Sequence, residues 1–84
     1  MPRHEKTLAR MAASPAGWKP RDFDLVYTGF GFEAIDGAKH TKYRHPSYPW
    51  LWTMVPRSDP LARAYAETAV KLIARLHELE EDAT

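Results

Sequence analysis

The chain has 84 residues, of which 44% are hydrophobic, 12% aromatic and 27% charged. This composition is too apolar for a disordered chain, and the length is too short for two ordinary domains. No cysteine is present, so no disulfide can supplement the small core expected at this size. No apolar run approaches the roughly 18 residues of a membrane span. We therefore expect one small cytoplasmic domain without a membrane segment.

The formal net charge of +1 conceals an uneven distribution of charges along the chain. Residues 1–36 carry five basic and five acidic groups, whereas residues 37–77 carry seven basic groups against two acidic ones. Residues 78–82 then add four negative charges. A local excess of basic residues is typical of a phosphate-binding surface, although a solvated charged face has the same composition.

The first predicted element is a helix over residues 3–13, which consist largely of helix formers with apolar residues at helical spacing. The Ser-Pro-Ala-Gly segment at residues 14–17 ends that pattern. Residues 1–17 are therefore predicted to form an N-terminal helical arm, and residues 18–84 a single domain.

A second, shorter helix is predicted to open at Pro20 and to be capped by Gly29, because proline is favoured in the first helical turn and glycine at the C-terminal end. Phe23, Val26 and Tyr27 lie one turn apart within it. This spacing places the three side chains on one face and makes them candidates for the core.

From residue 31 onward the pattern changes to short segments rich in aromatic and β-branched residues. Three such segments, 31–36, 38–45 and 50–55, are predicted to be antiparallel strands of a meander. Asp36 and Gly37 are a two-residue hairpin signal between the first two strands. The second connection contains two prolines and is expected to be a longer, stiffer loop.

The helical period returns over residues 58–81, with Ser58 or Asp59 as the predicted N-cap and Pro60 as the first helical residue. The predicted apolar stripe of this helix consists of Leu61, Tyr65, Thr68, Ala69, Leu72, Ile73, Leu76 and Leu79. The whole order predicts an α+β fold, a two-layer sandwich in which helices cover one face of a three-stranded antiparallel sheet. The other face would be open to a ligand.

The second predicted strand carries the residues with the clearest chemical potential. With a period of two, His40, Lys42 and Arg44 project to one face, while Tyr43 and His45 project to the other. A row of two cations and an imidazole suits a phosphodiester, because the cations neutralise phosphate and the imidazole can transfer a proton near neutral pH. The alternative is an exposed strand that merely carries polar residues.

A metal centre and a bound cofactor are not expected. His40 and His45 would lie on opposite faces of their strand, and His4 and His77 belong to separate helices, with no cysteine to complete a site. The sequence also lacks a glycine-rich phosphate loop and a nucleophile-elbow serine. Nucleotide hydrolysis and acyl transfer are therefore not expected.

The third predicted strand is apolar on both faces. Trp50, Trp52 and Met54 share one of them, and tryptophans in strand register are more often core residues than a platform for stacking bases. We therefore expect Trp50 and Trp52 to be core. Covering of one side by a partner is the alternative.

From Trp18 to about Leu76 the chain resembles the HicA family of mRNA-cleaving toxins from bacterial toxin-antitoxin pairs. The family has a helix ending near Gly-Phe, a strand of the type His-x-x-Tyr-Arg-His-Pro, a strand ending in proline, and a closing helix. The matching residues here are Gly31, Phe32, His40, Tyr43, Arg44, His45, Pro46, Val55 and Pro56. Ala38 and Lys39 stand where the family usually has Gly-Ser.

The resemblance implies a fold like that of double-stranded-RNA-binding domains and a metal-independent endoribonuclease that cuts mRNA. The strand histidine, here His40, would be the catalytic acid or base, while Lys39, Lys42 and Arg44 would hold the phosphate. A HicB-type antitoxin protein would cover this face. Two other hypotheses stay open, namely a non-catalytic RNA-binding module of the same fold and a partner-binding adaptor that uses Trp50 and Trp52.

Overall fold

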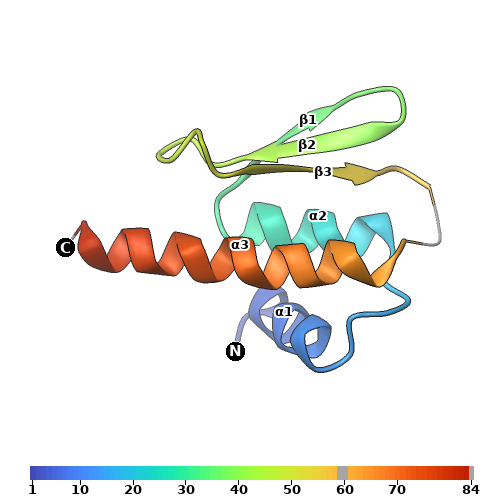
Figure 1. The fold of residues 1–84 in the computed structure, drawn as a ribbon, viewed down its shortest axis with the longest axis horizontal. Helices are drawn as coiled ribbons and strands as arrows, with labels where there is room; N and C mark the ends of the chain where they lie inside the picture. Colours follow the sequence, from blue (N-terminus) through green and yellow to red (C-terminus); the bar gives the residue numbers. More distant parts are fainter. Residues whose placement is uncertain (59–60, 84) are drawn as a thin grey trace.

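The structure is a computed structural model that describes residues 1–58 and 61–83. Within these residues, two helices are followed by three strands and a long closing helix (Figure 1). The elements are α1 (Arg3–Ala13), α2 (Pro20–Gly29), β1 (Glu33–Asp36), β2 (His40–Arg44), β3 (Trp52–Pro56) and α3 (Arg63–Asp82). The predicted α+β class with a three-stranded antiparallel sheet is confirmed.

The sheet is a meander in which β2 lies between β1 and β3. Helices α2 and α3 lie side by side beneath one face of this sheet, which gives the two layers of the sandwich (Figure 1). Helix α1 packs on the outer side of α2 and α3, away from the strands. None of the described helices lies over the opposite face of the sheet (Figure 1).

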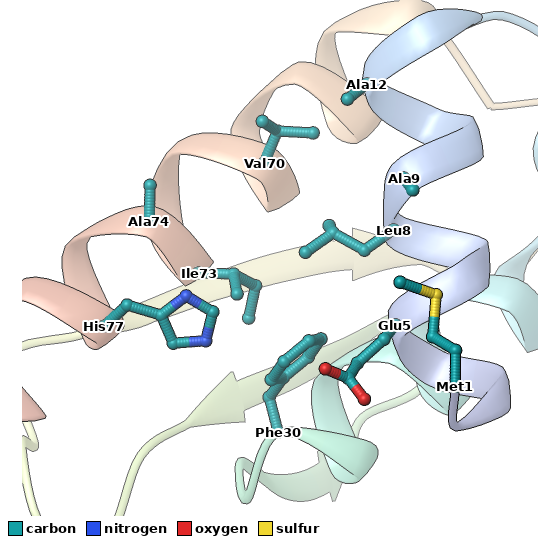
Figure 2. A pocket seen from close by; sticks show the side chains of 10 residues that line it. All are labelled: Met1, Glu5, Leu8, Ala9, Ala12, Phe30, Val70, Ile73, Ala74 and His77. Carbon is teal, nitrogen blue, oxygen red and sulfur yellow. The ribbon is translucent and has the colours of Figure 1, made fainter.

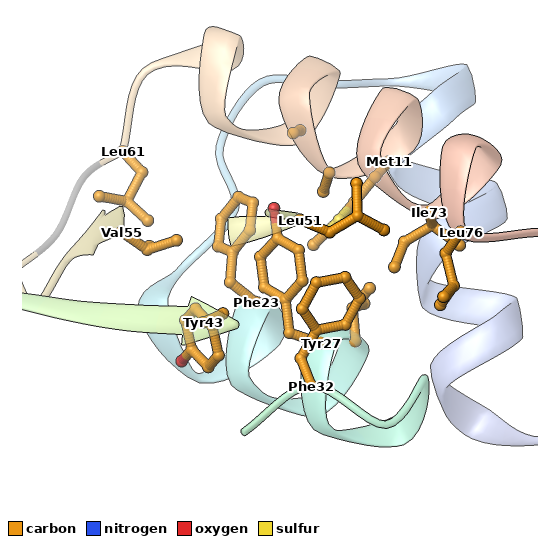
Figure 3. Packing of buried hydrophobic residues seen from close by; sticks show 13 residues of the cluster. Met11, Phe23, Tyr27, Phe32, Tyr43, Leu51, Val55, Leu61, Ile73 and Leu76 are labelled. Atoms are coloured by element: carbon orange, nitrogen blue, oxygen red, sulfur yellow. The ribbon is translucent and has the colours of Figure 1, made fainter. Parts of the chain in front are cut away.

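The hydrophobic core lies between the sheet and the helix pair and extends to α1 (Figure 3). Its buried members are Met11, Phe23, Val26, Tyr27, Phe32, Tyr43, Leu51, Val55, Leu61, Ala66, Ala69, Ile73 and Leu76. The three residues proposed as the buried face of α2 are all among them, so that prediction is confirmed. Because Met11 is fully buried, α1 contributes to the same core as the rest of the chain.

The two ends of α2 are set by local polar and backbone effects. The Asp22 carboxylate accepts a hydrogen bond from the Lys19 backbone N–H at 2.9 Å, which satisfies a donor at the helix start. At the other end Gly29 is the last helical residue, and Phe30 follows it as the C-cap. The cap is thus one position after the predicted Gly29, and the glycine with a left-handed φ, of +93°, is Gly31.

The hairpin between β1 and β2 turns two residues later than predicted. The Gly37 N–H donates to the His40 carbonyl at 2.8 Å, so the two central residues of the turn are Ala38 and Lys39. No described residue of this hairpin, Gly37 included, has a positive φ. Gly37 is favoured for a different reason, because a Cβ at this position would lie 2.9 Å from the His40 carbonyl oxygen.

Helix α3 begins later than predicted, at Arg63, with Ala62 as its N-cap. Ser58 is therefore not the cap, and Asp59 and Pro60 lie outside the described residues. Leu61 is buried in the core while Ala62 is still extended, with ψ 151°. Leu61 thus packs into the core two residues before the helix begins.

The buried stripe of α3 also differs in detail from the prediction. Ala69, Ile73 and Leu76 are buried as expected, but Thr68 is exposed and Ala66 is buried in its place. Alanine is small enough to let α3 approach its neighbours closely. Among the described residues, none of the helices has the length and apolarity needed to cross a bilayer.

The burial of Met11 predicts that the packing of α1 contributes to the stability of the fold. Met11→Ala should lower the free energy of unfolding by about 2 to 5 kcal/mol, because it leaves a cavity among fully buried side chains. Chemical denaturation measures this change. Arg10→Ala, an exposed neighbour on the same helix, is the control. An equally small effect of both substitutions would mean that α1 is not packed as described.

Candidate functional site

Strand β2 has one buried and one open side, as its alternation predicts. Thr41 and Tyr43 are buried on the helix side, whereas His40 and Arg44 are exposed and Lys42 is half-buried on the other. The sheet thus presents His40, Lys42 and Arg44 together on its uncovered face. This face is the candidate functional site.

Tyr43 is the anchor that decides which way β2 faces. Its ring stacks on Tyr27 of α2 with 4.8 Å between the ring centroids, and its hydroxyl donates to the Asp24 carboxylate at 3.0 Å. Burial raises the pKa of Tyr43 above its ordinary value, and the hydrogen bond to Asp24 raises it further. Burial alone likewise raises the pKa of Tyr27.

The register of the sheet places apolar side chains beside the basic ones. Across the strands, Lys42 lies between Ile35 and Met54, and Arg44 lies between Glu33 and Trp52. His40 faces Pro56 of β3. We call this surface the open face, defined as Glu33, Ile35, His40, Lys42, Arg44, Trp52, Met54 and Pro56.

The expectation that Trp50 and Trp52 are core residues is wrong. Trp50 is 62% exposed and Trp52 is 50% exposed, whereas Leu51 and Val55 are buried on the helix side. The alternation along the strand was predicted correctly, but the helices cover the face with the smaller side chains. Trp52 is therefore a large aromatic surface residue on the open face.

Lys42 and Trp52 are in direct contact across the two strands. The Lys42 ammonium lies 4.7 Å from the centroid of the Trp52 ring. This cation–π contact is worth about 0.5 to 1 kcal/mol at an exposed site and holds both side chains on the open face.

Arg57 is a candidate site residue that the sequence analysis did not select. Its guanidinium donates to the Gly37 carbonyl at 2.6 Å, and its backbone N–H donates to the Lys39 carbonyl at 2.9 Å. Both contacts tie the segment after β3 to the turn that precedes His40. The signal available from the sequence was the position of Arg57 directly after the strand that pairs with β2.

A shallow open pocket of about 590 Å³ lies at this end of the sheet. Its lining residues are Ala38, Lys39, His40, Pro56, Arg57 and Ser58. His40 and two basic residues, Lys39 and Arg57, thus line one hollow. This is an arrangement that can hold a phosphate next to a proton-transfer group.

The predicted site residues do not all meet at one point. His40 and Arg44 are four positions apart, which corresponds to about 13 Å along a strand. Lys39 lines the pocket with His40, whereas Lys42 and Arg44 follow further along the open face. The site is therefore a track, and its two ends can contact different phosphates of one polymer.

The other histidines take no part in this track. His45 is buried on the helix side, where its Nδ1 accepts a hydrogen bond from the Ser47 backbone N–H at 3.1 Å. His4 and His77 both contact the ring of Phe30. No group of three or more potential metal ligands occurs within residues 1–58 and 61–83.

A second hollow, of about 350 Å³, lies between α1 and α3 and is mostly apolar (Figure 2). Leu8, Phe30 and Ile73 point into it, with Glu5 and His77 at its margin (Figure 2). It lies on the other side of the helix layer from the open face. It therefore has no connection with the row of basic residues.

Comparisons with family models, with curated proteins and with solved structures returned no match to this chain.

The buried tyrosine pair predicts a loss of stability at alkaline pH. Tyrosine is uncharged when protonated, and its raised pKa in the folded state means that the unfolded chain loses these protons at a lower pH than the folded chain. The free energy of unfolding is therefore unaffected by the pair below about pH 10, and above it declines by up to about 1.4 kcal/mol per pH unit for each tyrosine. Denaturation of the wild type at several alkaline pH values measures this slope.

The double substitution Tyr27→Phe/Tyr43→Phe should flatten the alkaline decline, because neither phenylalanine can ionise. Tyr65→Phe, at a half-buried position of α3, removes a hydroxyl elsewhere and is the control. An unchanged slope in the double variant would contradict the role assigned to this pair.

Proposed function

We propose that this protein is the toxin of a type II toxin-antitoxin pair, a metal-independent endoribonuclease that cleaves mRNA in the cytoplasm with His40 as general acid or base. The observation that carries the proposal is the row of His40, Lys42 and Arg44 on the uncovered face of the sheet. The resemblance of residues 18–76 to the HicA family, including a histidine at position 40, supports the same activity.

The proposed reaction is transfer of a phosphodiester to the neighbouring 2′-hydroxyl. A base removes the 2′-hydroxyl proton, the 2′-oxygen forms a bond to phosphorus, and the bond from phosphorus to the 5′-oxygen breaks as that oxygen gains a proton. His40 performs one of these proton transfers. His45 cannot perform the other because it is buried on the far side of β2, so water supplies it.

The cations have separate tasks in this proposal. Lys39 and Arg57 line the pocket beside His40 and stabilise the negative charge that develops on the reacting phosphate. Lys42 and Arg44, further along the track, hold the neighbouring phosphates. This division replaces the expectation that Lys39, Lys42 and Arg44 all hold one phosphate.

A HicB-type antitoxin is the proposed protein partner. The open face combines basic residues with the exposed apolar side chains of Ile35, Trp52 and Met54. An acidic antitoxin surface with apolar contacts would neutralise Lys42 and Arg44 and keep RNA away from His40. Inhibition would then be steric and electrostatic, and the toxin would stay folded.

The second candidate function is a non-catalytic RNA-binding module, which the exposed Lys42–Trp52 contact favours because cations and aromatic rings together bind single strands. In that case His40→Ala would change little, whereas Lys42→Ala and Arg44→Ala would weaken RNA binding and reduce its dependence on salt. A protein that is only a partner-binding adaptor would bind no RNA at any salt concentration.

The catalytic proposal predicts cleavage of single-stranded RNA in the presence of EDTA. His40→Ala should abolish this cleavage, with a loss of about 100-fold or more, because it removes the proton-transfer group. Product formation on denaturing gels is the measurement. His77→Ala, an exposed histidine on α3, is the control and should retain full activity. Cleavage by His40→Ala at the wild-type rate would refute the assignment.

The partner proposal predicts where an antitoxin protects the backbone. Addition of the antitoxin should slow amide hydrogen exchange in residues 38–46 and raise the melting temperature, because a ligand that binds only the native state stabilises it. Protection confined to residues 3–13 would instead identify α1 as the docking element. That outcome would refute masking of the open face.

A further inference from the structure

We propose that Trp52 is a base-stacking residue that selects single-stranded RNA, holding the nucleobase of a nucleotide that flanks the scissile one. The inference depends on the proposed binding of RNA to the open face and adds a residue that determines which form of RNA binds. It assigns a task to an aromatic side chain that the core does not use.

The exposure of Trp52 is the first observation. Half of its surface is accessible, although it is the first residue of β3, in a sheet whose other face supplies the core. An indole left in water at this position loses the stabilisation of burial, which is about 25 cal/mol for each Å² of apolar area. Its position therefore suits a partner that covers it.

The contact with Lys42 is the second observation. The ammonium lies over the Trp52 ring at 4.7 Å from its centroid, so the indole is held beside a phosphate-binding cation. A nucleotide carries a flat ring and a phosphate within one unit. The base can stack on the exposed part of the indole while its phosphate contacts Lys42 or Arg44.

The pattern along the sheet is the third observation and points to a nucleic acid strand. Basic residues repeat along β2, and the apolar side chains of Ile35, Met54 and Trp52 flank them on the neighbouring strands. A single strand of RNA repeats a charge and an aromatic ring in the same way. Base–aromatic stacking contributes about 1 to 3 kcal/mol for each base.

Stacking on Trp52 would also distinguish single strands from duplexes. In an A-form duplex the bases are stacked on one another and their flat faces are not accessible to a side chain. A duplex can therefore contact Lys42 and Arg44 through its phosphates but cannot use Trp52. Lys42 and Arg44 would thus contribute affinity for either form of RNA, whereas Trp52 would favour single strands over duplexes.

The test uses a Trp18→Phe/Trp50→Phe variant, in which Trp52 is the remaining tryptophan. The probe is a short single-stranded 2′-deoxy oligonucleotide, which has no 2′-hydroxyl and so cannot undergo the proposed cleavage. We expect this strand to quench Trp52 fluorescence, while the same backbone with abasic sites and the matching duplex leave it nearly unchanged. Equal quenching by the abasic strand would overturn the proposal.

Affinity measurements provide the second readout. Trp52→Ala should weaken single-strand binding about 5- to 150-fold, which is the stacking contribution expressed as a ratio, and leave the salt dependence unchanged. Lys42→Ala should reduce the salt dependence. Trp50→Ala, at an exposed position outside β3 where the ring contacts Tyr48, is the matched control and should bind normally.

The outcomes separate this inference from the proposed function. Oligonucleotide binding that is insensitive to Trp52→Ala overturns the stacking proposal alone and assigns the indole to a protein partner. A chain that binds no oligonucleotide contradicts RNA binding itself. Loss of cleavage in His40→Ala is measured independently on a ribose-containing substrate.

Discussion

The two-sided character of β2 depends on Tyr43. Its ring is stacked on Tyr27, and its hydroxyl is held by Asp24, so the strand is fixed to α2 by one aromatic and one polar contact. Because side chains alternate along a strand, fixing Tyr43 inward directs His40, Lys42 and Arg44 outward. The position of the chemistry-bearing residues thus follows from a core contact on the opposite face of the sheet.

The turn before β2 adds a second constraint at the His40 end of the open face. The Arg57 guanidinium donates a hydrogen bond to the Gly37 carbonyl, and its backbone N–H donates to the Lys39 carbonyl. These bonds connect the end of β3 to the turn beside the pocket next to His40. The register of the sheet brings these groups together although they are far apart in sequence. Local rigidity of this kind is what a proton-transfer group needs in order to meet its substrate in a fixed orientation.

The fold class could be predicted from the sequence, as could the grouping of His40, Lys42 and Arg44 on the face of β2 opposite Tyr43, because both depend only on periodicity and turn chemistry. The exposure of Trp52 could not be predicted, because β3 is apolar on both sides and periodicity does not say which side the helices cover. Thr68 and Ala66 were misassigned for a related reason, because close helix packing selects small residues that hydrophobicity alone does not mark. Arg57 acquires its place only through the pairing of β3 with β2, which is a long-range property.

The open face contributes no side chain to the buried core cluster, and this separation bears on how the protein can change over evolution. Substitutions at His40, Arg44 or Trp52 alter a surface whose loss leaves the buried cluster intact, so their effect on folding is small. The chemistry of the open face can therefore change without a stability barrier. Folded abundance in a cell would consequently carry no information about which side chains this face presents.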